Sequence, residues 1–369
     1  MYNTRFKPSS PIQSLKANSN SYSRLGNLQI TKTLSEDTFS KTELGQDSVT
    51  QKRFAIKFLR PEMVSTMTPC LDNEASIQSL LSQEDHPNVL KVVKYLQNAD
   101  YIDKNGTVTK MNALVTELAE EGDLFEYLNT YGPLSEETAR TWFHDLINGL
   151  EFIHSKGIAH MNLKPENLWL TDKFSLKINN FSCSYIVSSE GDLLNQLHLS
   201  KSIYYTSPEL VSNQRGNGFI NDLFACGVIL FTMVTGYPPF NKASSDDIYY
   251  KLIIKQQFTT FWKQHERRGL SVSPAFKELL NNMLAYEPSQ RLSISELKSN
   301  SWYLGATKSY VEIKEELEKR KEASNPCSGC FSFGQQAREQ NKLSIPIQNK
   351  AGSLPKGFYA FNGIKIGKF

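Results

Sequence analysis

The chain has 369 residues, enough for one enzyme-sized domain of two lobes or for two ordinary domains, with sequence left over for tails. Apolar residues make up 39% of the chain and charged residues 21%, a balance that excludes a wholly disordered protein. Lys and Arg number 41 against 38 Asp and Glu, and this excess of three is too small to favour binding to nucleic acid or to anionic lipid.

The cysteines do not form the pattern of a disulfide framework, because they are odd in number and mostly far apart. They are Cys70, Cys183, Cys226, Cys327 and Cys330. The start of the chain lacks the apolar core of a signal peptide, and no apolar run approaches the length that spans a bilayer. We therefore expect a soluble, cytoplasmic protein without a transmembrane segment.

The first part of the chain predicts a small β-rich unit after a tail. Residues 1–26 are dominated by Ser, Asn, Pro and Lys, which predicts a flexible N-terminal tail. Apolar runs then predict a small sheet interrupted by one helix. The strands are expected at 28–34, 53–59, 89–96 and 113–118, and the helix at 72–81. The polar stretch 97–110 is expected to be a surface hairpin.

Beyond Gly122 the apolar residues take a helical spacing, which predicts a second, mostly helical lobe. Ser135 is expected to cap a long helix that ends near Ile153. Further helices are predicted at 221–235, 245–254, 273–284 and 293–298. Residues 304–322 predict a charged helix, docked or free, and residues 323–369 a flexible C-terminal tail, in which Cys327 and Cys330 favour a flexible turn over lipidation or a metal site.

The most specific motif is His160-Met161-Asn162-Leu163-Lys164-Pro165-Glu166-Asn167. It resembles the catalytic loop H-R-D-L-K-P-E-N of Ser/Thr protein kinases. Further landmarks of that family follow in order: Phe54 to Lys57, Leu114 to Leu118, Asn180-Phe181-Ser182, Ser207-Pro208-Glu209, Asp222, Gly227 and Arg291. The phrase from Gly227 to Phe240 is similar to the calmodulin-dependent and energy-sensing branch.

The resemblance implies an α+β, two-lobed protein-kinase-like fold that covers residues 27–303. It places a small antiparallel β-rich N-lobe at 27–118, a hinge at 117–121 and a larger, mostly α-helical C-lobe at 122–303. It also implies that Glu209, Asp222 and Arg291 brace the C-lobe through buried, charge-assisted hydrogen bonds. These three residues therefore indicate the fold and not the activity.

The resemblance also implies a nucleotide site between the lobes. It assigns Lys57 to bridging the phosphates and a helix glutamate, for which Glu74 is the candidate, although a strand-edge lysine and a solvated glutamate are the alternatives. The other residues implied around the nucleotide are Ala55, Thr116, Glu117, Ala119 and Trp169. The family has a smaller aliphatic residue in place of Trp169, so we expect the indole to fill part of the adenine slot.

Two carboxylates that phosphoryl transfer needs are replaced by amides. Asn162 stands where the family has its catalytic Asp, and an amide cannot act as a base at neutral pH. Asn180 stands where the family has the Asp of D-F-G, and a neutral amide oxygen is a poorer ligand for Mg²⁺. Lys164, which neutralises the transferred phosphate, and Asn167, a ligand of a second Mg²⁺, are retained.

The stretch from Leu34 to Thr42 takes the place of the family's L-G-x-G-x-F-G-x-V loop and contains no glycine. Without glycine the backbone cannot approach the phosphates as closely, and Glu36 and Asp37 are expected to repel them. Met161 replaces the Arg that would bind a phosphorylated activation loop. Ser202 and Tyr205 fit the segment that docks the substrate.

These losses favour a catalytically impaired pseudokinase that acts as a scaffold or allosteric regulator in signalling. Its implied partners are proteins, such as an active kinase or its substrate. ATP binding is expected to be weak and not to require Mg²⁺. The alternatives are a weak, atypical Ser/Thr kinase that transfers the γ-phosphate of ATP to protein hydroxyls, and a binding module whose tails carry the function.

Overall fold

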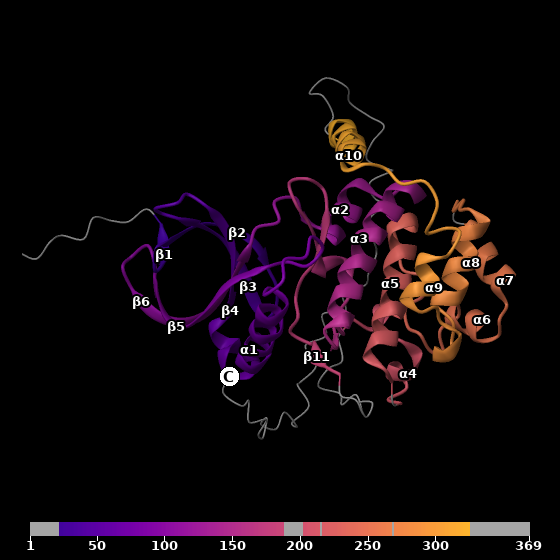
Figure 1. Ribbon diagram of the computed structural model, residues 1–369, viewed down its shortest axis with the longest axis horizontal. Helices are drawn as coiled ribbons and strands as arrows, with labels where there is room; N and C mark the ends of the chain where they lie inside the picture. The colour runs from indigo at the N-terminus through magenta and orange to yellow at the C-terminus, as the bar shows by residue number, and fades with distance from the viewer. Residues whose placement is uncertain (1–21, 188–201, 215, 268, 325–369) are drawn as a thin grey trace, which may run out of the picture. The chain divides into compact units, whose positions relative to one another are not determined.

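The computed structural model describes residues 22–187, 202–214, 216–267 and 269–324 (Figure 1). Most of the two expected tails, including Cys327 and Cys330, lies outside the described residues. The described chain has the two lobes that the sequence predicts, a β-rich N-lobe and a larger helical C-lobe.

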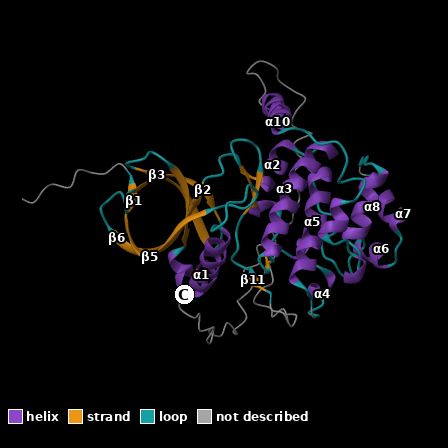
Figure 2. Ribbon diagram, viewed as in Figure 1, coloured by secondary structure: helices purple, strands orange, loops and turns teal. Residues whose placement is uncertain are grey.

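The N-lobe is built on a closed barrel of antiparallel strands in the order β1-β2-β3-β4-β6-β5 (Figure 2). The strands are β1 (Ser23–Leu25), β2 (Leu28–Glu36), β3 (Ser40–Asp47), β4 (Arg53–Leu59), β5 (Val92–Ile102) and β6 (Val108–Glu117). Because side chains alternate along a strand, one face of each strand fills the barrel with apolar groups. These are Leu25, Leu28, Ile30, Phe54, Ile56, Phe58, Ala113 and Val115.

One expectation for the N-lobe is wrong. The expected flexible tail includes Ser23–Leu25, yet this segment is strand β1, which pairs with β2 and β5, and Leu25 is only 1% exposed. The available local signal was the two-residue turn Gly26-Asn27 between β1 and β2, which is typical of a hairpin. The hairpin expected at 97–110 is present, with Ile102 paired to Val108 and the turn between them.

Helix α1 (Val64–Leu81) follows β4 after a short 3-10 turn, η1 (Pro61–Met63), and packs on the sheet through Leu71 and Ala75. The helix begins at Val64 rather than at the expected residue 72. The sequence pattern missed its first turns because they contain Pro69 and lack an apolar stripe. The loop after α1 returns to the C-lobe, where the Leu90 amide donates to the Ile178 carbonyl at 2.9 Å. This contact joins the two lobes through the backbone.

The C-lobe surrounds the long helices α3 (Glu136–Ser155) and α5 (Gly218–Thr235). As predicted, Ser135 caps α3 by accepting a hydrogen bond from the Thr138 amide at 3.2 Å. The other helices are α2 (Leu124–Tyr131), α4 (Pro208–Val211), α6 (Tyr250–Ile254), α7 (Phe258–Glu266), α8 (Pro274–Met283) and α9 (Ile294–Lys298). The helix expected at 245–254 is therefore shorter, and α7 has no counterpart among the predicted helices.

Short strands and 3-10 turns complete the C-lobe. Strands β7 (Gly122–Asp123), β9 (Leu168–Leu170) and β10 (Leu176–Ile178) form one small sheet. Strand β8 (Ile158–Ala159) pairs with β11 (Tyr185–Ile186). The 3-10 turns are η2 (Pro165–Asn167), η4 (Ile203–Tyr205) and η5 (Pro288–Gln290). Of these elements, β8, η2 and β9 flank or contain the catalytic-loop residues.

Helix α5 is long and apolar enough to cross a membrane, so the expectation that no apolar run has that length is wrong. In the structure, 89% of this segment is buried inside the C-lobe. Its side chains Phe224, Ile229 and Phe231 have no solvent exposure. The composition of α5 is thus accounted for by its position in the core.

Glu209, Asp222 and Arg291 make the buried, charge-assisted hydrogen bonds in the C-lobe that the resemblance implies. The guanidinium of Arg291 donates to both carboxylate oxygens of Glu209, at 2.8 and 2.7 Å, and both side chains are almost fully buried. The Asp222 carboxylate accepts from the backbone amides of His160 and Met161, each at 2.8 Å. Asp222 therefore fixes the backbone at the start of the catalytic loop.

The charged helix after the domain, α10 (Tyr310–Ser324), is docked rather than free and lies beside α2 and α3 (Figure 1). Its thin apolar stripe is covered, since Ile313 and Leu317 are fully buried. The Tyr310 hydroxyl donates to the Asp145 carboxylate on α3 at 2.7 Å, and Arg320 donates to the Pro133 carbonyl at 2.8 Å.

Candidate functional site

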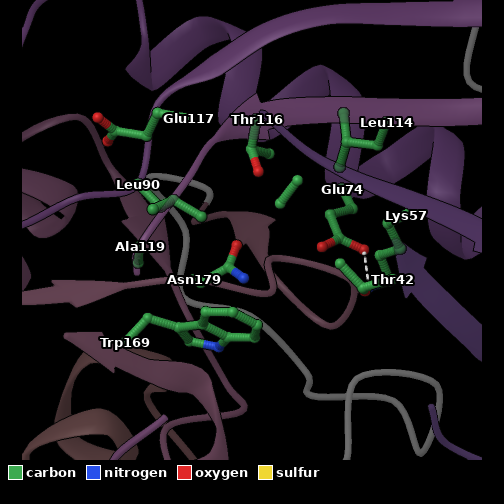
Figure 3. Close-up of a pocket in the computed structure, with 11 residues that line it drawn as sticks. Thr42, Lys57, Glu74, Leu90, Leu114, Thr116, Glu117, Ala119, Trp169 and Asn179 are labelled. Atoms are coloured by element: carbon green, nitrogen blue, oxygen red, sulfur yellow. Dashed lines mark hydrogen bonds and ion pairs between the residues drawn. The ribbon is translucent and has the colours of Figure 1, made fainter. Parts of the chain in front are cut away.

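A cleft between the lobes gathers most of the residues expected around a nucleotide (Figure 3). Its lining comes from β3, β4, α1, β6, the hinge and β9: Thr42, Ala55, Lys57, Glu74, Leu90, Leu114, Thr116, Glu117, Ala119, Trp169 and Asn179. The cavity volume is about 30 Å³, whereas pockets that hold drug-sized ligands enclose roughly 300–1,000 Å³. The cleft has the right lining for a nucleotide but little room.

Trp169 accounts for part of this small volume. It lies on β9, paired with Lys177 of β10, and its indole lies in the cleft on the side opposite Leu114 and Thr116 (Figure 3). This is the arrangement expected for a large aromatic residue in the adenine slot.

Lys57 and Glu74 form the expected ion pair, with 2.7 Å between the Lys57 Nζ and a Glu74 carboxylate oxygen. Strand β4 places Lys57 between Thr42 of β3 and Leu114 of β6. Helix α1 supplies Glu74, whose side chain is 2% exposed. The pair excludes the two alternatives, a strand-edge lysine and a solvated helix-face glutamate.

Glu117 makes contacts that hold the hinge itself. Its carboxylate accepts from the Lys91 amide at 2.9 Å and pairs with the Lys177 ammonium at 2.8 Å. The side chain thus ties the end of β6 to β10. Thr116 and Ala55 lie opposite each other in the β4–β6 pair and form the adjoining wall of the cleft.

The turn between β2 and β3, which takes the place of the glycine loop, is closed by its own carboxylate. One Asp37 carboxylate oxygen accepts from the backbone amides of Phe39 and Ser40, at 2.7 and 2.6 Å. Glu36 pairs with Arg60 at 3.0 Å. Backbone amides that converge in this way make an anion site, and here a side chain of the turn occupies it. Asp37 therefore caps the turn and Glu36 pairs with Arg60. The expectation that these two carboxylates repel phosphates stays a prediction.

The catalytic-loop amides are connected by hydrogen bonds. The Asn167 side-chain NH₂ donates to the Asn162 carbonyl at 2.6 Å, and the Asn180 NH₂ donates to the Asn167 side-chain oxygen at 3.0 Å. The Ser182 hydroxyl then donates to the Asn180 side-chain oxygen at 2.8 Å. The side-chain oxygens of Asn167, the retained metal ligand, and of Asn180, the expected poorer one, are therefore both acceptors of hydrogen bonds within the chain.

The described residues offer no substitute metal site. Among them, no cluster of three or more His, Cys, Asp or Glu side chains is placed to hold an ion. Lys164, expected to neutralise a transferred phosphate, lies 3.6 Å from the Glu166 carboxylate. The side chains at this position are the amides of Asn167 and Asn180 and the Lys164 ammonium, and none of the three is the carboxylate that Mg²⁺ prefers.

Buried groups behind the catalytic loop fix its conformation. His160 is fully buried; its ring Nε2 lies 3.1 Å from the Asn179 carbonyl and its Nδ1 accepts from the Asn162 amide at 3.2 Å. Burial holds the pKa of His160 below its usual value, because the low-dielectric site disfavours the imidazolium. A neutral ring with one donor and one acceptor matches these two contacts.

Met161 packs in a buried apolar cluster with Ala159 and Leu210, where the family has an Arg. The Met161 side chain carries no charge that could bind a phosphorylated activation loop. Tyr205 is the last residue of η4, and Ser202 is the residue that precedes this turn. Residues 188–201 of this segment are outside the described chain.

Sequence reasoning missed three amide side chains at the site: Asn73, Gln78 and Asn179. Gln78 lies four residues after Glu74 on α1 and is fully buried. A polar residue within the apolar stripe of a core helix was the available signal. Asn179 lines the cleft next to Asn180, and no local pattern distinguishes it from a surface residue.

Comparison with known proteins agrees with this geometry. The protein kinase domain family model matches residues 28–303. The chain is 30% identical over 346 residues to CBL-interacting protein kinase 11 of Oryza sativa subsp. japonica, an alignment that covers 90% of this chain and 63% of the relative. It is 32% identical over 298 residues to CBL-interacting serine/threonine-protein kinase 26 of Arabidopsis thaliana, covering 79% and 62%. The chain thus spans about three fifths of the length of these relatives.

Proposed function

Because this chain belongs to the protein kinase domain family, we propose that it is a pseudokinase, a kinase fold that regulates or assembles other proteins without transferring phosphate. The observation that carries the proposal is the pair of neutral amides at Asn162 and Asn180, of which the Asn180 NH₂ donates to the Asn167 side-chain oxygen. In active members of this family, carboxylates at the positions of Asn162 and Asn180 orient the attacking hydroxyl and hold Mg²⁺. Here the Asn180 side chain is hydrogen-bonded within the chain instead.

The turn between β2 and β3 supports the same proposal. The amides of Phe39 and Ser40 donate to Asp37, so a phosphate could bind them only by displacing that carboxylate. Glycines that would allow the backbone to rearrange are absent from residues 34–42. Binding and positioning of ATP phosphates are therefore both weakened.

A weak Ser/Thr kinase is the second candidate, and the intact Lys57–Glu74 pair favours it. In active kinases this pair must be in place for phosphoryl transfer. The pair alone supplies neither the base nor the metal ligand, so we rank this function below the first.

We further propose that the partners are proteins and that the chain acts in the cytoplasm. The two relatives described above are named for interaction with CBL, which makes a protein partner a reasonable extension for this chain. The cysteines are odd in number and mostly far apart in the sequence, which is not the pattern of a disulfide framework and fits a reducing compartment.

Thermal unfolding with nucleotide tests the proposed loss of metal binding. We expect millimolar ATP to raise the melting temperature slightly, by the same amount with MgCl₂ as with EDTA, because any affinity rests on Lys57 and the hinge rather than on a bound cation. Lys57→Met should remove the shift. A stabilisation that appears only with Mg²⁺ would mean that Asn167 and Asn180 still coordinate the metal.

A further inference from the structure

We propose that side-chain amides form a conformational lock, which holds α1, the Asn179–Ser184 segment and the catalytic loop in one arrangement without nucleotide or metal. The amide lock consists of Asn73, Gln78, Asn167, Asn179 and Asn180. It goes beyond the loss of activity, because it concerns what replaces the ligand as the connection between the lobes.

The first half of the lock joins α1 to the segment after β10. The Asn73 NH₂ donates to the Ser184 carbonyl at 2.9 Å and lies 3.4 Å from the Ser182 carbonyl. One turn further along α1, the Gln78 NH₂ donates to the Leu90 carbonyl at 2.8 Å and contacts the Asn179 side-chain oxygen at 3.4 Å. Helix α1 of the N-lobe thereby contacts the Asn179–Ser184 segment at both of the segment's ends.

The second half joins the same segment to the catalytic loop. Asn180 donates to Asn167, Asn167 donates to the Asn162 carbonyl, and Ser182 donates back to Asn180. The Asn179 amide also donates to the Asn167 carbonyl at 2.9 Å. Asn180 has φ of 67°, a left-handed conformation that asparagine tolerates better than most residues. The contacts therefore hold an otherwise unfavourable backbone.

The chemistry of these groups predicts how the lock behaves. All its members are neutral, so its hydrogen bonds do not titrate and are not screened by salt, unlike the Lys57–Glu74 pair. Gln78 is fully buried and Asn167 is 4% exposed, so breaking the hydrogen bonds of their NH₂ groups leaves buried donors unpaired. The Gln78 side-chain oxygen has no partner among the described residues, so Gln78 contributes to the lock through its NH₂ alone. α1 is thus expected to stay in place in the free protein.

Hydrogen–deuterium exchange on the full-length protein tests the lock. In the wild type, amides of α1 and of residues 179–184 should be as protected without nucleotide as with Mg·ATP, and protection should not change between 0.05 and 1 M NaCl. Asn73→Ala removes the donor to Ser184 and should raise exchange at 179–184 at least tenfold. Ser79→Ala, at an exposed position of the same helix, should leave it unchanged.

Gln78→Leu provides a second variant, since an apolar side chain of similar size keeps the packing of α1 but breaks the contacts to Leu90 and Asn179. Exchange in α5 monitors global unfolding and should stay constant in both variants. Wild-type protection that requires Mg·ATP, or protection at 179–184 that survives both substitutions, would overturn the proposal. This inference rests on the proposed function only in assuming that no metal is bound. Phosphotransfer by the wild type would refute the proposed function, and the exchange experiment would still decide whether the amide lock exists.

Discussion

Restoring both carboxylates, in the variant Asn162→Asp/Asn180→Asp, is expected to leave turnover far below that of an ordinary kinase, roughly 1–100 per second. The double variant regains a base and a metal ligand, and it keeps Lys57 and Lys164. The Phe39 and Ser40 amides still donate to Asp37, and Trp169 still lies in the cleft. Since misplacement can cost about two powers of ten with all catalytic groups present, carboxylates alone do not repair the site.

A stepwise series separates chemistry from positioning. Adding Ser35→Gly, Asp37→Gly, Ser40→Gly and Trp169→Leu to the double variant should raise phosphate incorporation into a generic basic substrate above that of the double variant. The control carries these four substitutions without the carboxylates and should remain inactive. Ordinary turnover by the double variant alone would show that the turn and Trp169 are no obstacle, and that the defect is confined to the two amides.

Breaking the buried pair between Arg291 and Glu209 is expected to have the largest effect on stability. Arg291→Met leaves the Glu209 carboxylate buried without its partner, a change that typically costs about 3–5 kcal/mol of unfolding free energy. The guanidinium also donates to the Ala285 and Tyr286 carbonyls, so further acceptors lose their donor. Denaturation in urea measures the loss.

The matched control for that substitution is Lys314→Met, which removes a cation from an exposed pair with Glu318 on α10 at 4.0 Å. Exposed pairs contribute about 0–1 kcal/mol. Equal losses in the two variants would contradict a bracing role for the buried pair. Loss in Arg291→Met alone would agree with the assignment of Glu209 and Arg291 to the fold.

The sequence predicts most of the fold because the motifs are local and ordered. The run around Asn162 and the strand with Lys57 place the two lobes, and the Lys57–Glu74 pair follows from the resemblance and is present in the structure. Strand β1 was missed because the polar composition of residues 1–26 outweighed the two-residue turn Gly26-Asn27 that joins it to β2. Its second pairing, with residues 101–102, is a long-range contact that local composition does not indicate.

The candidate site is predicted less completely, because its hydrogen bonds depend on where side chains point. The sequence shows that Asn162 and Asn180 lack charge, but not that Asn180 donates to Asn167. The sequence shows that Asp37 adds negative charge to the turn, but not that its carboxylate accepts from the turn amides. Residue types thus predict which chemistry is lost, and geometry shows what replaces it.

Incubation of the purified protein with γ-labelled ATP tests the central claim most directly. The assay uses wild type and Lys57→Met, each with Mg²⁺ and with Mn²⁺, alone and with a generic basic protein substrate. We predict that the wild type incorporates no more label than Lys57→Met, because both lack a catalytic base and a carboxylate-held metal. Robust incorporation by the wild type that disappears in Lys57→Met would contradict the pseudokinase proposal.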